Sequence, residues 1–143
     1  MTRKLVLCTI ISLMVCACWR DNQIENIFLK NESNFEIIIK FTKNSKIIND
    51  SLKSNGGNIW IAENRFAHYY PDSLILKYLS TIKITRIDIA NLLVGGNEEY
   101  VVLFYFKEGY SSIAWKSTDK LTMPLRYYIK KQINSQWFLV NFD

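Results

Sequence analysis

The placement of the cysteines limits how this chain can be stabilised. All three lie near the N-terminus, at Cys8, Cys16 and Cys18, and none follows in the rest of the 143 residues. A body without cysteine has no disulfide to hold it, so it must bury a hydrophobic core. The composition allows such a core, because 49% of the residues are hydrophobic and 14% are aromatic. The length is that of one ordinary domain.

The first residues have the pattern of a secretory signal peptide. Two cations, Arg3 and Lys4, precede an uncharged run from Leu5 to Ala17. A membrane-spanning helix needs ~20 apolar residues, so this run is too short to span, but it has the length of a signal-peptide core. We therefore expect three regions: a signal peptide over 1–17, a polar tether over 18–23 and one domain over 24–143.

Cys18 is the candidate lipidation site. The segment Val15-Cys16-Ala17-Cys18 resembles the bacterial lipobox, in which a branched aliphatic residue, a tolerant position and a small residue precede an invariant cysteine. The resemblance implies that Cys18 becomes the first residue of the mature protein and carries a diacylglycerol, with a further acyl chain in many Gram-negative bacteria. Two or more acyl chains hold a protein stably on a membrane. The alternatives are a cleaved signal with a free thiol, or an uncleaved short anchor.

Alternating apolar residues in the body indicate β-strands. Phe35, Ile37, Ile39 and Phe41 fall on one face of an extended chain, and 27–30 is expected to pair with this strand across the polar turn 31–34. Further strands are expected at 46–52, 59–63, 73–78, 82–88, 99–106, 111–116, 125–131 and 136–142.

Two segments of the body have no clean alternation. Residues 64–72 fit a loop or one helical turn, and residues 86–94 fit a short helix as well as a strand. Many short strands with frequent turn residues predict a mainly β fold, a single antiparallel β-sandwich-like domain.

Two parts of the body resemble a group of lipoproteins. "IFLKNESNFEIIIKF" (27–41) and "DSLILKY" (72–78) are similar to segments of small β-rich lipoproteins of Gram-negative bacteria. Those proteins tend to begin with an asparagine-containing turn between two alternating strands. The resemblance implies an envelope location, at the outer membrane, and a β-rich fold, and it implies no activity.

The charge pattern argues against nucleic acid as a partner. The formal net charge is +5, but the cations are scattered singly along the chain. Nucleic-acid-binding domains concentrate their cations in a patch or stripe. We expect other partners: the membrane, through lipid on Cys18, and an envelope protein or glycan.

Few residues of the chain have the pattern of a catalytic or metal site. His68 is the single histidine, so neither a zinc site nor a nucleophile with its base is indicated. Carboxylates could in principle form a glycosidase-type pair. The candidates are Asp88, Glu98, Glu99 and Glu108. The adjacent Glu98 and Glu99 would point to opposite faces of a strand, which weakens a pair. The alternative is that they are solvated charges at the end of a strand. We expect no enzymatic activity, no cofactor and no metal.

Aromatic residues of the middle segment are candidate partner-binding groups. Trp60, Phe66, Tyr69 and Tyr70 cluster in the sequence. Aromatic rings in loops stack on sugars or anchor a partner protein. The alternative is that these rings pack against one end of the core.

Two serines are candidate glycosylation sites. Ser51 and Ser73 each lie in an Asp-Ser-Leu triplet, at 50–52 and 72–74. The triplet resembles the Asp-Ser/Thr-aliphatic acceptor used for O-glycosylation of exported proteins in some Gram-negative bacteria.

Together these patterns favour a membrane-anchored lipoprotein that serves as a non-enzymatic interaction module of the envelope. An immunity or inhibitor lipoprotein, directed against a toxin or hydrolase, fits the small size and the lipid anchor equally well. An envelope hydrolase is the third alternative, and it needs a carboxylate pair, or His68 with a partner, in a cleft.

Overall fold

The computed structural model of the chain describes residues 2–94, 96–107, 111–118, 123 and 127–142, with side chains from Asp21 onward apart from Val94 and Phe142. The helical elements are α1 (Thr2–Asn44), α2 (Lys46–Ser54), the 3₁₀ turn η1 (Glu63–Arg65), α3 (Phe66–Tyr69) and α4 (Ser73–Ile82). The strands are β1 (Asn58–Ala62), β2 (Ile84–Val94), β3 (Asn97–Phe106), β4 (Ser111–Lys116), β5 (Tyr127–Gln132) and β6 (Trp137–Phe142).

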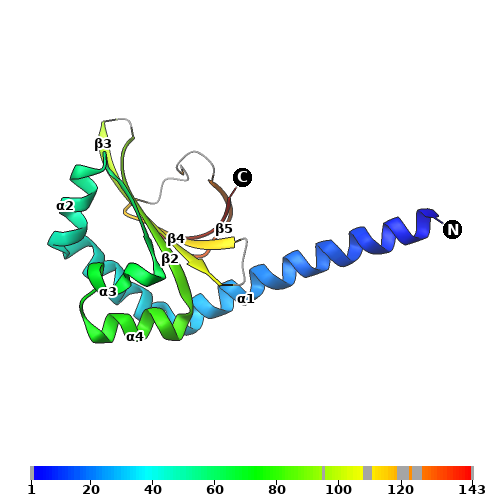
Figure 1. Cartoon of the computed structure of the whole chain (residues 1–143). Coiled ribbons are helices and arrows are strands. Elements are labelled where there is room, and N and C mark those ends of the chain that lie inside the picture. Colours follow the sequence, from blue (N-terminus) through cyan, green and yellow to red (C-terminus); the bar gives the residue numbers. More distant parts are fainter. Residues whose placement is uncertain (1, 95, 108–110, 119–122, 124–126, 143) are drawn as a thin grey trace.

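The strands form one antiparallel sheet with the order β1-β2-β3-β4-β6-β5. The helices lie on one face of this sheet, and the first half of α1 extends beyond it (Figure 1). Side chains such as Ile87, Ile89, Val102 and Phe104 are buried in the core that the helices share with this face. The antiparallel sheet is as expected, but the predicted mainly β fold is only partly right, because helices make up much of the chain. The predicted sandwich is not shown, because helices cover the face where a second sheet would pack.

The strands predicted at 27–30 and 35–42 are wrong, because both segments belong to α1. Phe35, Ile38, Ile39 and Thr42 are buried, and this i, i+3, i+4, i+7 spacing marks one face of a helix. Ile37 is 41% exposed. The run "FEIIIKF" is so rich in apolar residues that it satisfies a period of two and a period of 3.6 equally.

The turn predicted at 31–34 coincides with a kink in α1. Asn31 has non-helical dihedral angles, with φ −128° and ψ 15°. Its side-chain amide donates a hydrogen bond to the Ile27 carbonyl at 2.8 Å. Asparagine competes with the backbone in this way and bends a helix without ending it. The predicted turn therefore corresponds to the kink at Asn31, where two helical segments of α1 meet.

The strands predicted at 46–52 and 73–78 are also wrong, because they form α2 and α4. Ile75, Leu79 and Ile82 are buried at helical spacing on α4. The cap of this helix was visible in the sequence. Asp72 is the N-cap, and its carboxylate accepts a hydrogen bond from the Leu74 backbone N–H at 2.8 Å.

Most of the remaining predictions of local structure are confirmed. The turn before β1 contains Gly56 and Gly57 at φ +67° and +87°. The segment 64–72 contains short helical turns, and 86–94 takes the strand alternative. Strand β3 lies inside the sheet and pairs with β4, and β5 and β6, close to the segments predicted as the last two strands, form an antiparallel hairpin. Leu125, predicted to begin β5, lies outside the described residues.

Helix α1 is tied to the β5–β6 hairpin by its acidic side chains. These lie on one face of the helix, and each contacts a different hairpin residue. The pairs are Asp21 with Lys130, Glu25 with Lys131 at 2.7 Å, Glu32 with Asn134 at 3.1 Å, and Glu36 with the indole N–H of Trp137 at 2.7 Å. We call this set the helix–hairpin clasp.

Residues 21–23, predicted as part of an irregular tether, therefore belong to a helix that contacts the domain. The side chains of the expected signal peptide and of Cys18 lie outside the described residues. Within the described part of the chain, no helix combines the length and the apolar character needed to cross a membrane.

Candidate functional site on the sheet face away from the helices

The sheet face away from the helices has a small core of its own. Val101, Leu103, Phe138 and Val140 are buried there, in a cluster separate from the core that the helices share with the other face. Side chains of β5, among them Tyr127, pack against this core. The sheet therefore curls, so that β5 folds back over β2 and β3.

A hydrogen-bonded network lies at the place where the curl closes. The carboxylate of Asp88 accepts hydrogen bonds from Arg86 Nε at 2.6 Å, from the Tyr105 hydroxyl at 3.0 Å and from the Tyr127 hydroxyl at 3.3 Å. The two tyrosine hydroxyls also lie within hydrogen-bonding distance of each other. Because each phenol has one proton, two hydrogen bonds are shared among these three contacts. The Arg86 guanidinium stacks on the Tyr105 ring, 4.6 Å from its centroid. We call these four residues the Asp88 network.

The charges of this network are fixed at neutral pH. Burial raises the pKa of Tyr105, and the hydrogen bonds with Tyr127 and Asp88 raise it further. Burial raises the pKa of Tyr127 as well. The hydrogen bond that Arg86 donates to Asp88 raises the pKa of Arg86. Both phenols therefore stay protonated and act as donors, while Arg86 keeps its charge.

A groove of about 260 Å³ lies beside the Asp88 network. Trp60 of the edge strand β1 is one wall, and its side chain shares a face with Asp88 because the two residues pair across β1 and β2. Arg86, Asp88 and Tyr127 also line the groove. Trp60 is 60% exposed, which is unusual for so large an apolar side chain. The groove thus offers an aromatic surface beside a rigid polar one.

The other three aromatic candidates are not on the surface. Phe66, Tyr69 and Tyr70 are 5%, 7% and 0% exposed, so the prediction that they are available to a partner is wrong. They take the packing alternative, between the helices and the sheet. The Tyr70 hydroxyl lies 3.1 Å from Thr42 Oγ1, which itself donates to the Ile38 carbonyl at 2.7 Å. Tyr70 is therefore the donor to Thr42, and it ties α3 to α1.

The candidate carboxylates that the structure describes lie in different surroundings. Asp88 belongs to the network above. Glu99 is buried at the far end of β3, where it forms an ion pair with Lys116 at 2.9 Å and accepts a hydrogen bond from Thr118 at 2.6 Å. Glu98 is exposed, and Glu108 lies outside the described residues. The structure thus places Asp88 and Glu99 in separate networks.

His68 and the two candidate glycosylation serines lie on helices. His68 is exposed on α3, with its ring edge-on to Tyr69. Ser73 is exposed at the start of α4, and Ser51 is half-buried in α2. Their glycosylation stays a prediction. Among the described residues, no group of three His, Cys, Asp or Glu side chains is placed to hold a metal ion.

The sequence contained one local signal for the Asp88 network. Arg86 and Asp88 are two residues apart on a strand, so their side chains lie on the same face and pair readily. The contribution of Tyr127 depends on the curl of the sheet, for which the sequence has no local signal. No protein-family model, curated protein or solved structure matched the chain.

Proposed function

We propose that the protein is a lipoprotein of the bacterial cell envelope, anchored in the outer membrane through lipid on Cys18, and that it acts as a non-enzymatic interaction module. The lipobox-like segment before Cys18 supports the anchor. The exposed Trp60 beside the Asp88 network supports the interaction site and is the observation on which the proposal depends.

The composition of the groove favours a protein as its occupant. Tryptophan, tyrosine and arginine are the residues most enriched in the energetic centres of protein interfaces, and Trp60, Tyr127 and Arg86 all line this groove. Arg86 and Tyr127 are held in place by Asp88 before any partner arrives. Such preorganisation reduces the entropy lost on binding. A glycan that stacks on Trp60 is the competing occupant.

An immunity or inhibitor lipoprotein is the second candidate function. The rigidity of the Asp88 network favours it, because tight inhibitory interfaces use surfaces that change little on binding. This candidate requires a toxin or hydrolase as the partner, whereas the general proposal does not.

The anchor is tested by the intact mass of the mature protein from membrane fractions, for wild type and Cys18→Ala. We expect a wild-type chain that begins at Cys18 and carries added acyl mass. We expect the variant to be uncleaved or released from the membrane. A wild-type chain that begins near residue 18 without acyl mass would refute the anchor, and the same spectra would show any glycan on Ser51 or Ser73.

The groove is tested by photocrosslinking in intact cells. A photoreactive residue is placed at Trp60, and in a matched control at Leu93, which is 78% exposed on the helix-covered face. We expect a discrete protein adduct from position 60 and none of the same mass from position 93. With the purified partner, Trp60→Ala should weaken binding by about 30-fold, as the loss of a 2 kcal/mol interface residue does. Identical adducts from both positions, or adducts with glycan alone, would contradict the proposal.

A further inference from the structure

A second cavity, of about 380 Å³, lies between α1, the end of α4 and the end of β3. Its polar lining consists of three lysines and two amides: Lys30, Lys83, Lys107, Gln23 and Asn26. The lysines come from three separate parts of the fold, so the folding of the chain brings them together. Its volume is within the range of sites that hold small ligands. We call it the lysine cavity.

The electrostatics of the lysine cavity favour an anion. Three lysines line one cavity, so their like charges repel one another, and a bound anion would offset that repulsion. Among the described residues, no carboxylate lines this cavity. Glu63 lines an adjacent hollow together with Lys83 and Lys107, but it does not line the lysine cavity itself. A phosphate group suits the lining, because lysines bind phosphate as point charges and amide N–H groups donate to its oxygens.

The backbone of Lys83 adds a second observation. Lys83 follows α4 with φ +62°, and it is the single non-glycine residue at positive φ in the described part of the chain. Glycine is the residue best suited to this position, because a Cβ is strained there. The chain thus has a lysine where the backbone alone favours glycine, and that lysine lines the cavity. Strained backbone of this kind concentrates at functional sites.

The lysine cavity also lies close to the predicted anchor. Gln23 lines the cavity and follows Cys18 by five residues, which span at most ~18 Å even when fully extended. We propose that the cavity binds the phosphate group of an anionic phospholipid headgroup in the membrane that holds the anchor. The choice of a headgroup over free phosphate rests on the proposed lipid anchor, whereas the phosphate site itself rests on the cavity.

The test uses the full chain in a non-ionic detergent at constant ionic strength. Thermal midpoints are measured against rising concentrations of a short-chain phosphatidylglycerol, and separately against inorganic phosphate and a short-chain phosphatidylcholine. We expect phosphatidylglycerol to raise the midpoint of the wild type. Lys30→Ala, Lys83→Gly and Lys107→Ala should each need at least tenfold more of it for the same rise.

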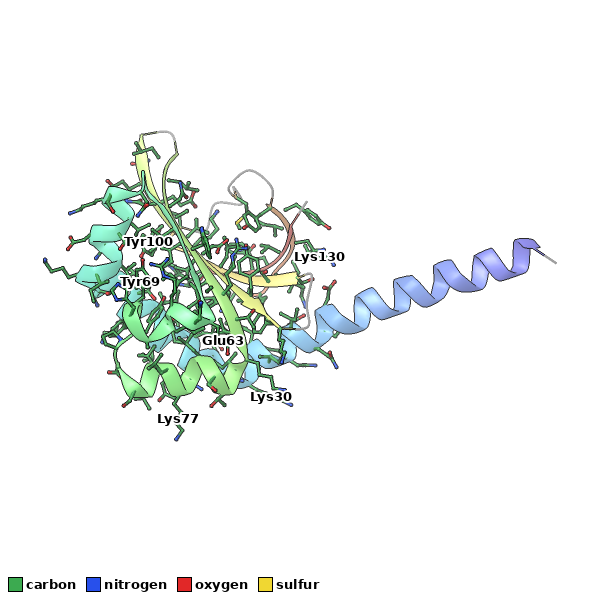
Figure 2. The ribbon with its side chains drawn as sticks, in the orientation of Figure 1. Lys30, Glu63, Tyr69, Lys77, Tyr100 and Lys130 are labelled. Carbon is green, nitrogen blue, oxygen red and sulfur yellow. The ribbon has the colours of Figure 1, made fainter. Side chains whose placement is uncertain are left out.

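Two controls make the test specific. Lys77→Ala carries the same charge change, and Lys77 is exposed on α4 but does not line the cavity; Figure 2 labels it together with Lys30. It should respond as the wild type does. Lys83→Gly removes the strain at this position, so a lost response in that variant does not come from misfolding.

Three results would overturn the proposal. An equal rise in all variants would show attraction to the net charge alone, and an equal rise with phosphatidylcholine would show a detergent-like effect. A stronger response to inorganic phosphate than to phosphatidylglycerol would refute the headgroup as the source. If the mature protein lacks acyl mass but the response to phosphatidylglycerol persists in a lysine-dependent way, the anchor is refuted and the phosphate site stands.

Discussion

The hydroxyl of Tyr127 lies 3.3 Å from a carboxylate oxygen of Asp88, although three strands separate β5 from β2 in the sheet order. Neighbouring strands are about 4.8 Å apart, so in a flat sheet β2 and β5 would be about 19 Å apart. The contact therefore exists because the sheet curls. It joins the two sides of the curl beside the groove that contains Trp60.

Removing the charge of Asp88 should loosen this closure. Asp88→Asn keeps one acceptor oxygen but removes the partner of Arg86, so we expect a loss of about 1–3 kcal/mol in the free energy of unfolding. Urea denaturation measures the loss. Glu98→Gln, at an exposed position of the neighbouring strand β3, is the matched control and should stay within about 0.5 kcal/mol of wild type. Equal behaviour of the two variants would mean that the Asp88 network contributes little.

Tyr70 should make the protein sensitive to alkaline pH. Burial raises the pKa of Tyr70 above its usual value of about 10. At pH values between about 10 and the raised pKa of the folded chain, the unfolded chain loses the phenol proton and the folded chain keeps it. The free energy of unfolding therefore falls as the pH rises. The slope is at most about 1.4 kcal/mol per pH unit for this group. Below pH 10 both states are protonated and the effect disappears.

Tyr70→Phe isolates this effect. The variant loses the hydrogen bond to Thr42, which costs about 1 kcal/mol at neutral pH. Above pH 10 it should lose stability less steeply than wild type, so that the two curves converge. Urea denaturation from pH 8 to 11 measures both. Parallel curves would show that the folded chain releases the Tyr70 proton as readily as the unfolded chain does.

The buried ion pair of Lys116 and Glu99 should be costly to break from one side. Lys116 is fully buried, and its ammonium group lies 2.9 Å from the carboxylate of Glu99. Lys116→Met leaves a buried carboxylate without this partner, so we expect a loss of about 3–5 kcal/mol. Adding Glu99→Gln should recover part of the loss, because the buried negative charge is then removed. A double-mutant cycle measures the coupling, and strict additivity would argue against a strong pair.

The helical conformation of α1 can be tested at two isoleucines that are two residues apart. Ile39 is 3% exposed and Ile37 is 41% exposed. On a strand these residues would share a face, but on the helix they do not. Ile39→Asp should unfold the domain, since it buries an unpaired charge, and Ile37→Asp should lower the thermal midpoint by only a few degrees. Circular dichroism during heating distinguishes the two. Equal losses would favour the strand.

The sequence predicted the second half of the sheet better than the helical layer. In β3, β4 and the hairpin, β-branched and aromatic side chains favour strands, and β3 and β4 are largely buried on both faces, as central strands are. In α1, α2 and α4 the apolar residues are too dense for their spacing to decide between helix and strand. The caps were the better signal there, since Ser45 and Asp72 each stand before a helix and accept hydrogen bonds from it.

The candidate site was predicted only in part for a related reason. Trp60 was recognised as an aromatic of interest, and its exposure required only that β1 lie at a sheet edge. The Asp88 network and the lysine cavity depend on contacts between distant segments. Their residues are ordinary in the sequence and acquire a role only through the curl of the sheet and the packing of α1.

The helix–hairpin clasp has a consequence for the order in which the chain can fold. Its contacts join the beginning of the domain to its end, as between Asp21 and Lys130, which are 109 residues apart. Contacts this distant form late, because the chain between them must first be brought together. Helix α1 is synthesised before the strands that hold it, because β5 and β6 come much later in the chain. The core of the domain therefore stays incomplete until β6 has been synthesised.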